Sequence, residues 1–233
     1  MTVSLVLLPG LDGTGSLFEP LLKELPDELE PIVVSYPAQK FLEYAALRDL
    51  ALRHVPAGRP FVLLGESFSG PVAVLAAALR PEGLLGVVLC ASFVSAPRPW
   101  AKFALPLLQL LPIHVAARMV GRYMLMGRFK AAGVFDSMLA ALSSVPEKVL
   151  RARLAAAANI DVSAELGAIA VPSLYLQASE DLVVPKAAAE AFLRAAARGN
   201  VAVVTGLHFL LQCVPSDAAE CVVRFIERLP RGV

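Results

Sequence analysis

The sequence predicts an α/β fold with a doubly wound, mostly parallel sheet of about six strands. Two observations predict it. Short aliphatic and β-branched runs alternate along the chain with longer amphipathic segments. The short runs are almost continuously apolar, as expected of parallel strands covered on both faces. At 233 residues, of which 57% are hydrophobic, the chain can form one such domain with a large core.

The expected elements alternate in regular order. The strand candidates are residues 3–8, 32–35, 61–64, 85–90, 173–177 and 201–204. The helix candidates are residues 16–25, 41–55, 67–79, 185–197 and 217–229. Ser16 with Glu19, and Asp217 with Glu220, have the spacing of a capping box, so we expect these pairs to begin the first and last helices.

Residues 95–168 break this alternation. They contain no convincing strand, and their helical patterns are interrupted by five prolines. The stretch is rich in Leu, Ala, Met and Phe, which favours a helical lid over a disordered loop. The expected organisation is a core of residues 1–94 and 169–233 with a lid, residues 95–168, inserted after the fourth strand.

The strongest functional signal is residues 62–70, VLLGESFSG. An apolar strand runs into a Gly-x-Ser turn, and an alanine-rich helix follows at once. Ser67 then lies on a sharp turn above a helix N-terminus, the arrangement that presents a weak nucleophile to a carbonyl carbon. The elbow pattern ends in glycine, but Ser69 stands there, and we expect slight crowding. The alternative interpretation of Ser67 is a helix N-cap.

An acid and a histidine follow later strands in the order Ser, acid, His. Asp181 lies in the loop after the fifth strand, and His208 lies just beyond the sixth. Loops at the carboxyl ends of parallel strands meet at one edge of the sheet, where ligands bind. For His54, at the end of a helix pattern, and His114, in the expected lid, we favour surface or packing roles.

With these motifs, the chain resembles the α/β-hydrolase superfamily over nearly its whole length. The resemblance implies that Ser67 is the nucleophile, that His208 is its general base and that Asp181 orients the imidazole. The adjacent Glu180 is the alternative acid, but the Asp-x-Val-Val-Pro spacing after residue 180 resembles the family pattern and favours Asp181. The chain starts at what would be the family's third strand, so we expect the N-terminal hairpin to be absent.

The resemblance also extends to residues 9–15, PGLDGTG, which are similar to the oxyanion loop of small bacterial hydrolases of the esterase type. Pro9 replaces the family's histidine. The backbone N–H groups of Leu11 and Phe68 are then expected to hold the oxyanion. Asp12 is expected to form a turn through its own backbone. Glu66 either tunes the site or is simply a solvated or hydrogen-bonded carboxylate.

These residues predict a serine hydrolase that cleaves carboxylic esters through an acyl-enzyme. The Leu, Met and Phe content of the expected lid favours apolar acyl or alkyl groups. An acyl-thioesterase or acyltransferase with the same triad is one alternative. A catalytically weak small-molecule receptor of the same fold is another, from a different class of protein.

Other classes of function are disfavoured. The net charge of +1 gives no overall attraction to nucleic acid. Gly13-x-Gly15 is followed by no lysine, which argues against a phosphate loop. The three histidines lack ligand spacing, so we expect no metal or other cofactor. Cys90, Cys213 and Cys221 are expected to be reduced core thiols. With no leader and no apolar span of about 20 residues, the sequence favours a cytoplasmic protein.

The expected lid has an uneven charge. Residues 95–135 contain no acidic residue, and Arg118 and Arg122 lie one helical turn apart on one face. A second face, formed by apolar side chains, is expected to lie over the pocket. We favour a solvated basic face, with weak peripheral contact to anionic lipid as the alternative. The basic residues are Arg98, Lys102, Arg118, Arg122, Arg128 and Lys130, and the apolar ones are Val115, Met119, Tyr123 and Met126.

Overall fold

A single six-stranded sheet forms the centre of the protein. The computed structural model describes residues 2–97, 113–129 and 131–230. The strand order is β2-β1-β3-β4-β5-β6, and every neighbouring pair is parallel. The expected doubly wound parallel sheet is therefore confirmed. The strands are β1 (Val3–Leu8), β2 (Leu29–Val33), β3 (Phe61–Glu66), β4 (Leu84–Cys90), β5 (Ser173–Ala178) and β6 (Gly199–Val204).

The central strands match the expected runs closely, whereas the two edge strands differ more. β2 begins three residues earlier than expected and includes Pro31, which an edge strand tolerates because one side needs no ladder hydrogen bond. β6, at the other edge, leaves Val203 63% exposed. Edge strands are covered less completely than central ones, so their sequences are less uniformly apolar.

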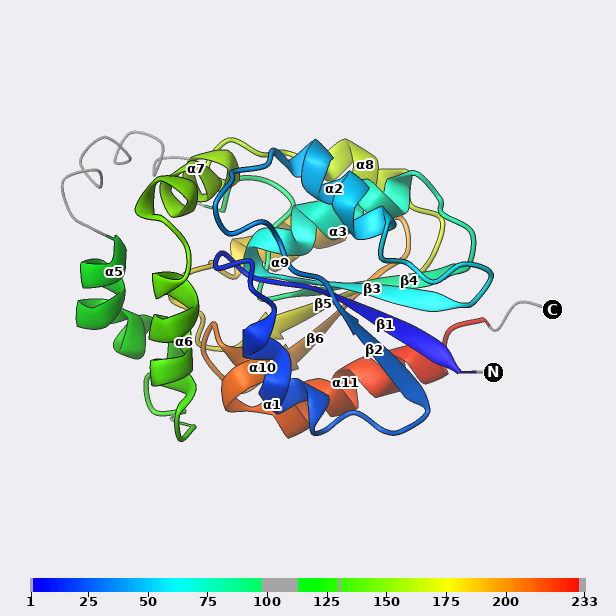
Figure 1. The fold of residues 1–233 in the computed structure, drawn as a ribbon. Helices are drawn as coiled ribbons and strands as arrows, with labels where there is room; N and C mark the ends of the chain where they lie inside the picture. Colours follow the sequence, from blue (N-terminus) through cyan, green and yellow to red (C-terminus); the bar gives the residue numbers. More distant parts are fainter. Residues whose placement is uncertain (1, 98–112, 130, 231–233) are drawn as a thin grey trace.

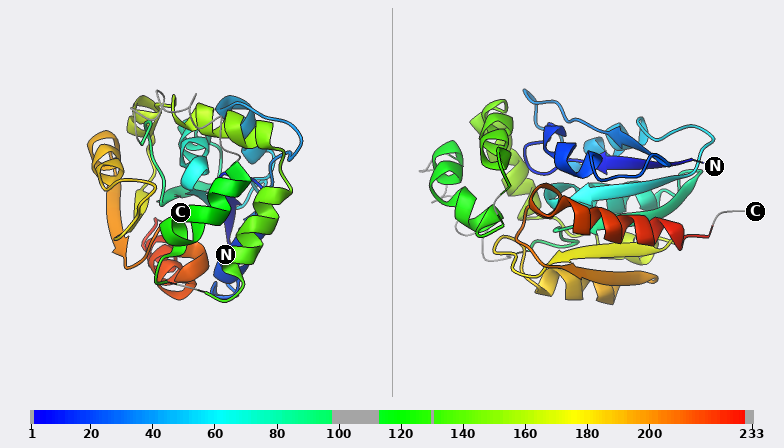
Figure 2. Two further views of the ribbon diagram at one scale, coloured as in Figure 1. Left: turned by 90° about the vertical axis from the view of Figure 1, so that its left-hand side faces the viewer. Right: turned by 90° about the horizontal axis from the view of Figure 1, so that it is seen from below.

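Helices cover both faces of the sheet (Figure 1). One face carries α2 (Tyr44–Leu52), α3 (Gly70–Ala78) and α9 (Ala187–Ala195), together with the short α8 (Ser163–Gly167). The other carries α1 (Glu19–Leu22), α10 (Leu210–Cys213) and α11 (Pro215–Glu227), and α11 crosses the sheet in the right-hand view of Figure 2.

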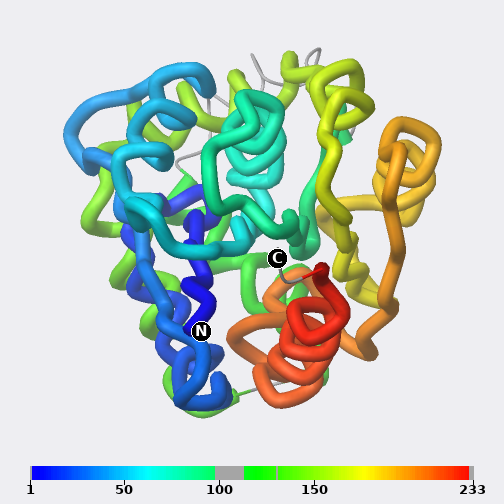
Figure 3. Tube along the Cα trace, turned by 90° about the vertical axis from the view of Figure 1, so that its right-hand side faces the viewer, coloured from blue at the N-terminus to red at the C-terminus, as the bar shows by residue number. Residues whose placement is uncertain are grey.

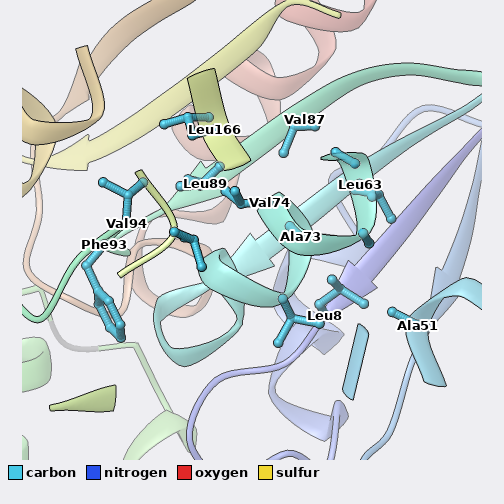
Figure 4. Packing of buried hydrophobic residues seen from close by; sticks show 14 of the residues in the cluster. Leu8, Ala51, Leu63, Ala73, Val74, Val87, Leu89, Phe93, Val94 and Leu166 are labelled. Atoms are coloured by element: carbon cyan, nitrogen blue, oxygen red, sulfur yellow. The ribbon is translucent and has the colours of Figure 1, made fainter. Parts of the chain in front are cut away.

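Successive strand residues alternate between two buried clusters. Leu63 and Val87 face α3 in the first cluster, and Figure 4 shows them against Ala73 and Val74. Val62 and Val88 belong to the second cluster, under α11. Both faces of the central strands are therefore buried, which explains their continuous apolar runs.

Both expected capping boxes are wrong. The first helical turn, Ser16–Phe18, is preceded by Gly15 at φ 77° and has no side-chain cap. Ser16 Oγ bonds Thr14 Oγ1 at 2.8 Å instead. The last helix begins at Pro215, two residues before Asp217, and also has no side-chain cap. Proline at the first helical position removes a donor that a cap would otherwise have to satisfy.

Residues 95–168, between β4 and β5, are called the insertion below, and those of them that the structure describes are mostly helical. Its described elements are α5 (Ile113–Ala116), the π-helical segment Ala117–Met126, α6 (Val134–Ser143), α7 (Glu147–Ala157) and α8. A separate apolar cluster holds α6 and α7 together. The green helices of the insertion lie across one end of the sheet in Figure 2, whereas both termini lie at the opposite end in Figure 3.

The end of the sheet beneath the insertion is the end where the strands finish. β1 starts beside the N-terminus and runs toward α6 and α7 in Figure 1, and all strands are parallel to it. The loops after β1, β3, β5 and β6 therefore meet under the insertion. Arg98, Lys102 and Lys130 of the expected basic lid lie outside the described residues. No helix in the described part is long and apolar enough to cross a membrane.

Candidate active site

Ser67 sits on a strained turn between β3 and α3. Its φ is +47°, a region that costs a non-glycine residue about 1–3 kcal/mol. The turn is possible because residue 65 is glycine: a Cβ there would lie 2.4 Å from the Ser69 carbonyl oxygen. Ser92, just after β4, donates its hydroxyl to the Ser67 carbonyl at 2.5 Å and so braces the turn from the next strand.

Ser67, His208 and Asp181 form one hydrogen-bonded chain. Ser67 Oγ lies 2.9 Å from His208 Nε2, and His208 Nδ1 lies 2.9 Å from Asp181 Oδ2. The carboxylate beside Nδ1 favours the tautomer with hydrogen on that nitrogen, which leaves Nε2 free to accept from the serine. Both the imidazole and the carboxylate are buried, at 5% and 6% side-chain exposure, so the contact is shielded from water.

The neighbouring acid points elsewhere. Asp181 Oδ1 accepts the backbone N–H groups of Val183 and Val184 at 2.8 and 2.9 Å, which fixes the carboxylate toward His208. Glu180 instead forms an ion pair with Arg128 of the insertion and is 41% exposed. Of the two acids weighed from the sequence, the structure brings only Asp181 to the histidine.

The loop after β1 lies opposite the serine. Leu11 and Phe68 both line the same cavity as Ser67 and His208. Among the described residues, the Leu11 N–H donates no hydrogen bond, so it is available to an oxygen atom in the cavity. Asp12 forms the expected turn: its Oδ1 accepts the Thr14 N–H at 2.8 Å.

The two departures from the family pattern, Pro9 and Ser69, contact each other. The Ser69 hydroxyl donates to the Pro9 carbonyl oxygen. Because a hydroxyl has one proton, the Tyr36 hydroxyl must be the donor in its 2.6 Å contact with Ser69 Oγ. Burial raises the pKa of Tyr36, which keeps it protonated as a donor. Ser69 therefore joins the start of the loop after β1 to the β3–α3 turn through its hydroxyl, which glycine lacks.

Glu66 is a buried carboxyl beside the nucleophile. Its Oε1 accepts a hydrogen bond from the Gln212 side-chain amide at 2.8 Å. Burial raises the pKa of Glu66 to about 7, and the neighbouring Asp12 carboxylate adds to the effect while the Gln212 hydrogen bond opposes it. Of the two structural roles that the sequence allows for Glu66, a solvated or a hydrogen-bonded carboxylate, the structure shows the hydrogen-bonded one.

Arg153 is a residue that the sequence did not single out. It lies on α7 and is only 1% exposed. One guanidinium nitrogen donates to the carbonyl oxygens of Leu11 and Asp12 at 2.9 and 2.7 Å, and the other donates to that of Pro37 at 3.2 Å. Nothing local marks it, because these partners lie 116 to 142 positions away in the chain.

A cavity of about 520 Å³ opens above Ser67, between the core and the insertion. Near the serine it is polar, with His208, Asp12 and Glu66; elsewhere its walls are mostly apolar. The apolar lining from the insertion includes Val120, Met124, Leu125, Met138, Leu142 and Leu154.

The helix face that lines this cavity is not the expected one. Met119 and Tyr123 are 73% and 72% exposed and point outward with Arg118 and Arg122, so their expected placement over the pocket is wrong. Met126 is buried but does not line the cavity. The residues of this segment that line the cavity are instead Ala116, Ala117, Val120, Gly121, Met124 and Leu125.

The other candidates stay outside this site. His54 is exposed and contacts the Leu50 carbonyl, and His114 lies 3.4 Å from Glu147 within the insertion. The three cysteines are free thiols; Cys90 is buried and the other two are half-buried. In the residues that the structure describes, no three His, Cys, Asp or Glu side chains are grouped as metal ligands would be.

Comparisons with known proteins agree with this fold. Comparison with curated proteins gives no match. The esterase from Exiguobacterium antarcticum has a TM-score of 0.82 at 17% identity, covering 96% of this chain and 91% of the esterase. The enol-lactonase from Burkholderia xenovorans LB400 has a TM-score of 0.83 at 16% identity, covering 98% and 92%. A thermophilic esterase from Thermogutta terrifontis has a TM-score of 0.78 at 23% identity, covering 97% and 89%.

Structural similarity at such low identity shows the fold only, whereas comparison of the sequence with a family model shows the family. The family model described as the alpha/beta hydrolase family matches residues 5–222, which include all of the sheet except the first two residues of β1, and all of the loops that meet at Ser67. The chain belongs to the α/β-hydrolase family, and its chemistry is that of a hydrolase.

Proposed function

We propose that the protein is a serine hydrolase that cleaves carboxylic esters of apolar acyl or alkyl groups. The observation that carries the proposal is the hydrogen-bonded chain from Ser67 through His208 to Asp181, which opens into a largely apolar cavity. The proposed substrate is a small-molecule ester, and the proposed reaction uses no metal or other cofactor. Solved esterases of the same fold support the reaction class.

In this mechanism Ser67 Oγ attacks the ester carbonyl carbon while His208 Nε2 takes its proton. The oxygen of the tetrahedral intermediate accepts hydrogen bonds from the Leu11 and Phe68 backbone N–H groups, each worth about 3 kcal/mol in the transition state. His208 returns the proton to the leaving alkoxide, and water then releases the acyl group by the reverse sequence. Asp181 orients the imidazole and stabilises its charged form.

The insertion is proposed to act as a lid over the acyl or alkyl group. Apart from Arg151, its side chains that line the cavity are apolar, and pockets of this kind bind through apolar contact with a few placed polar groups. Excluding water from the cavity also strengthens the hydrogen bonds made to the oxyanion.

A single panel tests the proposal. Purified protein is assayed with p-nitrophenyl esters from acetate to dodecanoate and with acyl-CoA thioesters of matching length. We expect ester turnover that rises with chain length beyond acetate, and covalent addition of an alkyl fluorophosphonate to Ser67 by mass spectrometry. Ser67→Ala is expected to lose both.

The alternatives give different results in the same panel. Preference for the thioesters would make the protein an acyl-thioesterase, and transfer of the acyl group to an added alcohol would make it an acyltransferase. Phosphonate labelling without turnover of any substrate would indicate a receptor that retains the triad. Full activity in the Ser67→Ala variant would contradict the proposed nucleophile.

A further inference from the structure

The guanidinium of Arg153 is a buried charge whose hydrogen-bond partners are all backbone carbonyls. The side chain is 1% exposed, and no carboxylate of the described residues forms an ion pair with it. Arg151, two residues earlier on the same helix, instead pairs with Glu147 at 2.8 Å. A buried charge is costly unless it is hydrogen-bonded, and its three carbonyl partners satisfy this need. The Tyr36 ring, 5.9 Å from the guanidinium carbon, and the nearby Asp12 carboxylate also stabilise the charge.

Two of these partners belong to the loop that carries the Leu11 N–H. One guanidinium nitrogen bridges the carbonyl oxygens of Leu11 and Asp12. The other reaches the Pro37 carbonyl, in the segment that follows β2. Arginine suits this role because its planar fork holds several acceptors in fixed directions, whereas a lysine ammonium is a point charge on a flexible stem.

The loop is shaped to admit this side chain. Gly13 has a φ of +70°, and a Cβ at that position would lie 2.6 Å from an Arg153 guanidinium nitrogen. Glycine therefore leaves the room that the guanidinium occupies. On the other side of the loop, the Ser69 hydroxyl holds the Pro9 carbonyl oxygen, so the Leu11 N–H lies between two anchored points.

We propose that Arg153, on α7 of the insertion, is a positioning residue that orients the Leu11 N–H toward the oxyanion. The inference rests on the proposed function, because it assigns a role in the same oxyanion hole. It makes α7 part of the catalytic architecture as well as part of the cover over the cavity. A displacement of about 1 Å at such a donor can lower the rate by about 100-fold.

The test separates transition-state stabilisation from substrate binding. Arg153→Lys and Arg153→Met are assayed with p-nitrophenyl butyrate and with an alkyl trifluoromethyl ketone. Ser67 Oγ adds to the ketone carbon, its proton passes to His208, and the adduct's oxyanion occupies the proposed hole. We expect kcat to fall about 100-fold in both variants, as when one donor is lost. KM should stay within about threefold, and ketone affinity should fall in parallel with kcat.

A matched control is Leu150→Ala, a truncation of a fully buried side chain on the same helix that does not line the cavity. It should lower the melting temperature while leaving kcat and ketone affinity near wild type. Arg153→Ala should regain activity when guanidinium ion is added at low millimolar concentration. If Arg153→Met fails to fold, kcat and ketone affinity of the charge-preserving Arg153→Lys variant provide the test.

Two outcomes overturn the inference in different ways. Wild-type protein that neither hydrolyses esters nor binds the ketone would remove the proposed function and this role with it. Active wild-type protein with an Arg153→Lys variant of unchanged kcat and ketone affinity would remove the positioning role alone. Losses in Leu150→Ala equal to those in Arg153→Met would also overturn it, because general destabilisation would then explain them.

Discussion

Asp181 and Glu180 are adjacent acids with different surroundings. Asp181 is held by two backbone N–H groups and faces His208, whereas Glu180 is half exposed and pairs with Arg128. Asp181→Asn should keep the fold but favour the wrong imidazole tautomer, lowering kcat by about 10⁴-fold. Glu180→Gln, the matched control, should change kcat by less than about threefold, as expected for an exposed ion pair. Steady-state kinetics decide, and a larger loss in Glu180→Gln would reverse the assignment.

Glu66 makes the stability of the fold depend on pH. Its pKa is raised to about 7 in the folded protein, against 4.5 for an ordinary glutamate. The folded state therefore keeps a proton that the unfolded chain has lost between these two values. This contribution to stability is complete below pH 4.5 and disappears as the pH rises through 7.

Glu66→Gln removes this titration while keeping an oxygen acceptor. Relative to wild type, the variant should gain on the order of 2 kcal/mol in free energy of unfolding between pH 5 and pH 8. Urea unfolding of both proteins at the two pH values measures the gain. The exposed Glu82→Gln is the control and should follow wild type. A constant difference between Glu66→Gln and wild type would show that Glu66 does not titrate in this range.

At the scale of elements, the β3–α3 turn depends on a close approach of backbones. A Cβ on Gly65 would lie 2.4 Å from the Ser69 carbonyl oxygen and 2.9 Å from the Gly70 Cα. Backbone atoms cannot rotate away, so Gly65→Ala should destabilise the fold by about 3 kcal/mol, the upper end for overpacking, and reduce ester turnover.

The control for this substitution is Gly58→Ala. Gly58, unlike Gly65, has a positive φ of 66°, and nothing lies within 4 Å of its Cβ position. Its cost should be only the backbone penalty of about 1–2 kcal/mol, with turnover unchanged. Urea unfolding and the ester assay compare the two. Equal effects would mean that the turn can shift to make room for a side chain at residue 65.

The insertion contacts three of the loops that meet at the site. The Leu125 carbonyl accepts the Phe209 N–H at 3.1 Å, next to His208. Arg128 pairs with Glu180 beside Asp181, and Arg153 donates to the Leu11 carbonyl oxygen in the loop after β1. The loops after β5 and β6 are also joined directly, because the Glu180 N–H donates to the Gly206 carbonyl at 2.9 Å. The arrangement of the site therefore depends on helices far away in the sequence.

These contacts show which features could be predicted from the sequence. The strands and the Ser67 elbow depend on local patterns, such as apolar runs and a glycine at a crowded turn, and the expected sheet is confirmed. Ser92 and Arg153 act through partners 25 and 142 residues away, respectively, and no local pattern marks them. The sequence-based prediction of which face of Ala117–Met126 points inward is wrong, because apolar residues occur on both sides of this helix.

At the scale of the whole molecule, the cavity between the core and the insertion should set the length of the acyl group. Gly121 lines this cavity from the π-helical segment, and a Cβ there would make an ordinary 3.5 Å contact with Met138. Leucine at this position can therefore be accommodated at its base while its branches extend into the cavity. It would occupy volume that a long acyl chain needs.

Gly121→Leu should lower kcat/KM for p-nitrophenyl decanoate by about 10-fold or more and leave the acetate within about twofold, because each excluded methylene contributes about 1–3 kcal/mol. Met119→Leu, an outward position 73% exposed on the same helix, is the control and should change neither substrate. Mass-spectrometric labelling of Ser67 by a short fluorophosphonate checks that the elbow is intact in both variants. If decanoate and acetate fall together in Gly121→Leu while labelling is normal, the acyl chain does not lie in this cavity. The alcohol side of the ester would then be the part that the insertion covers.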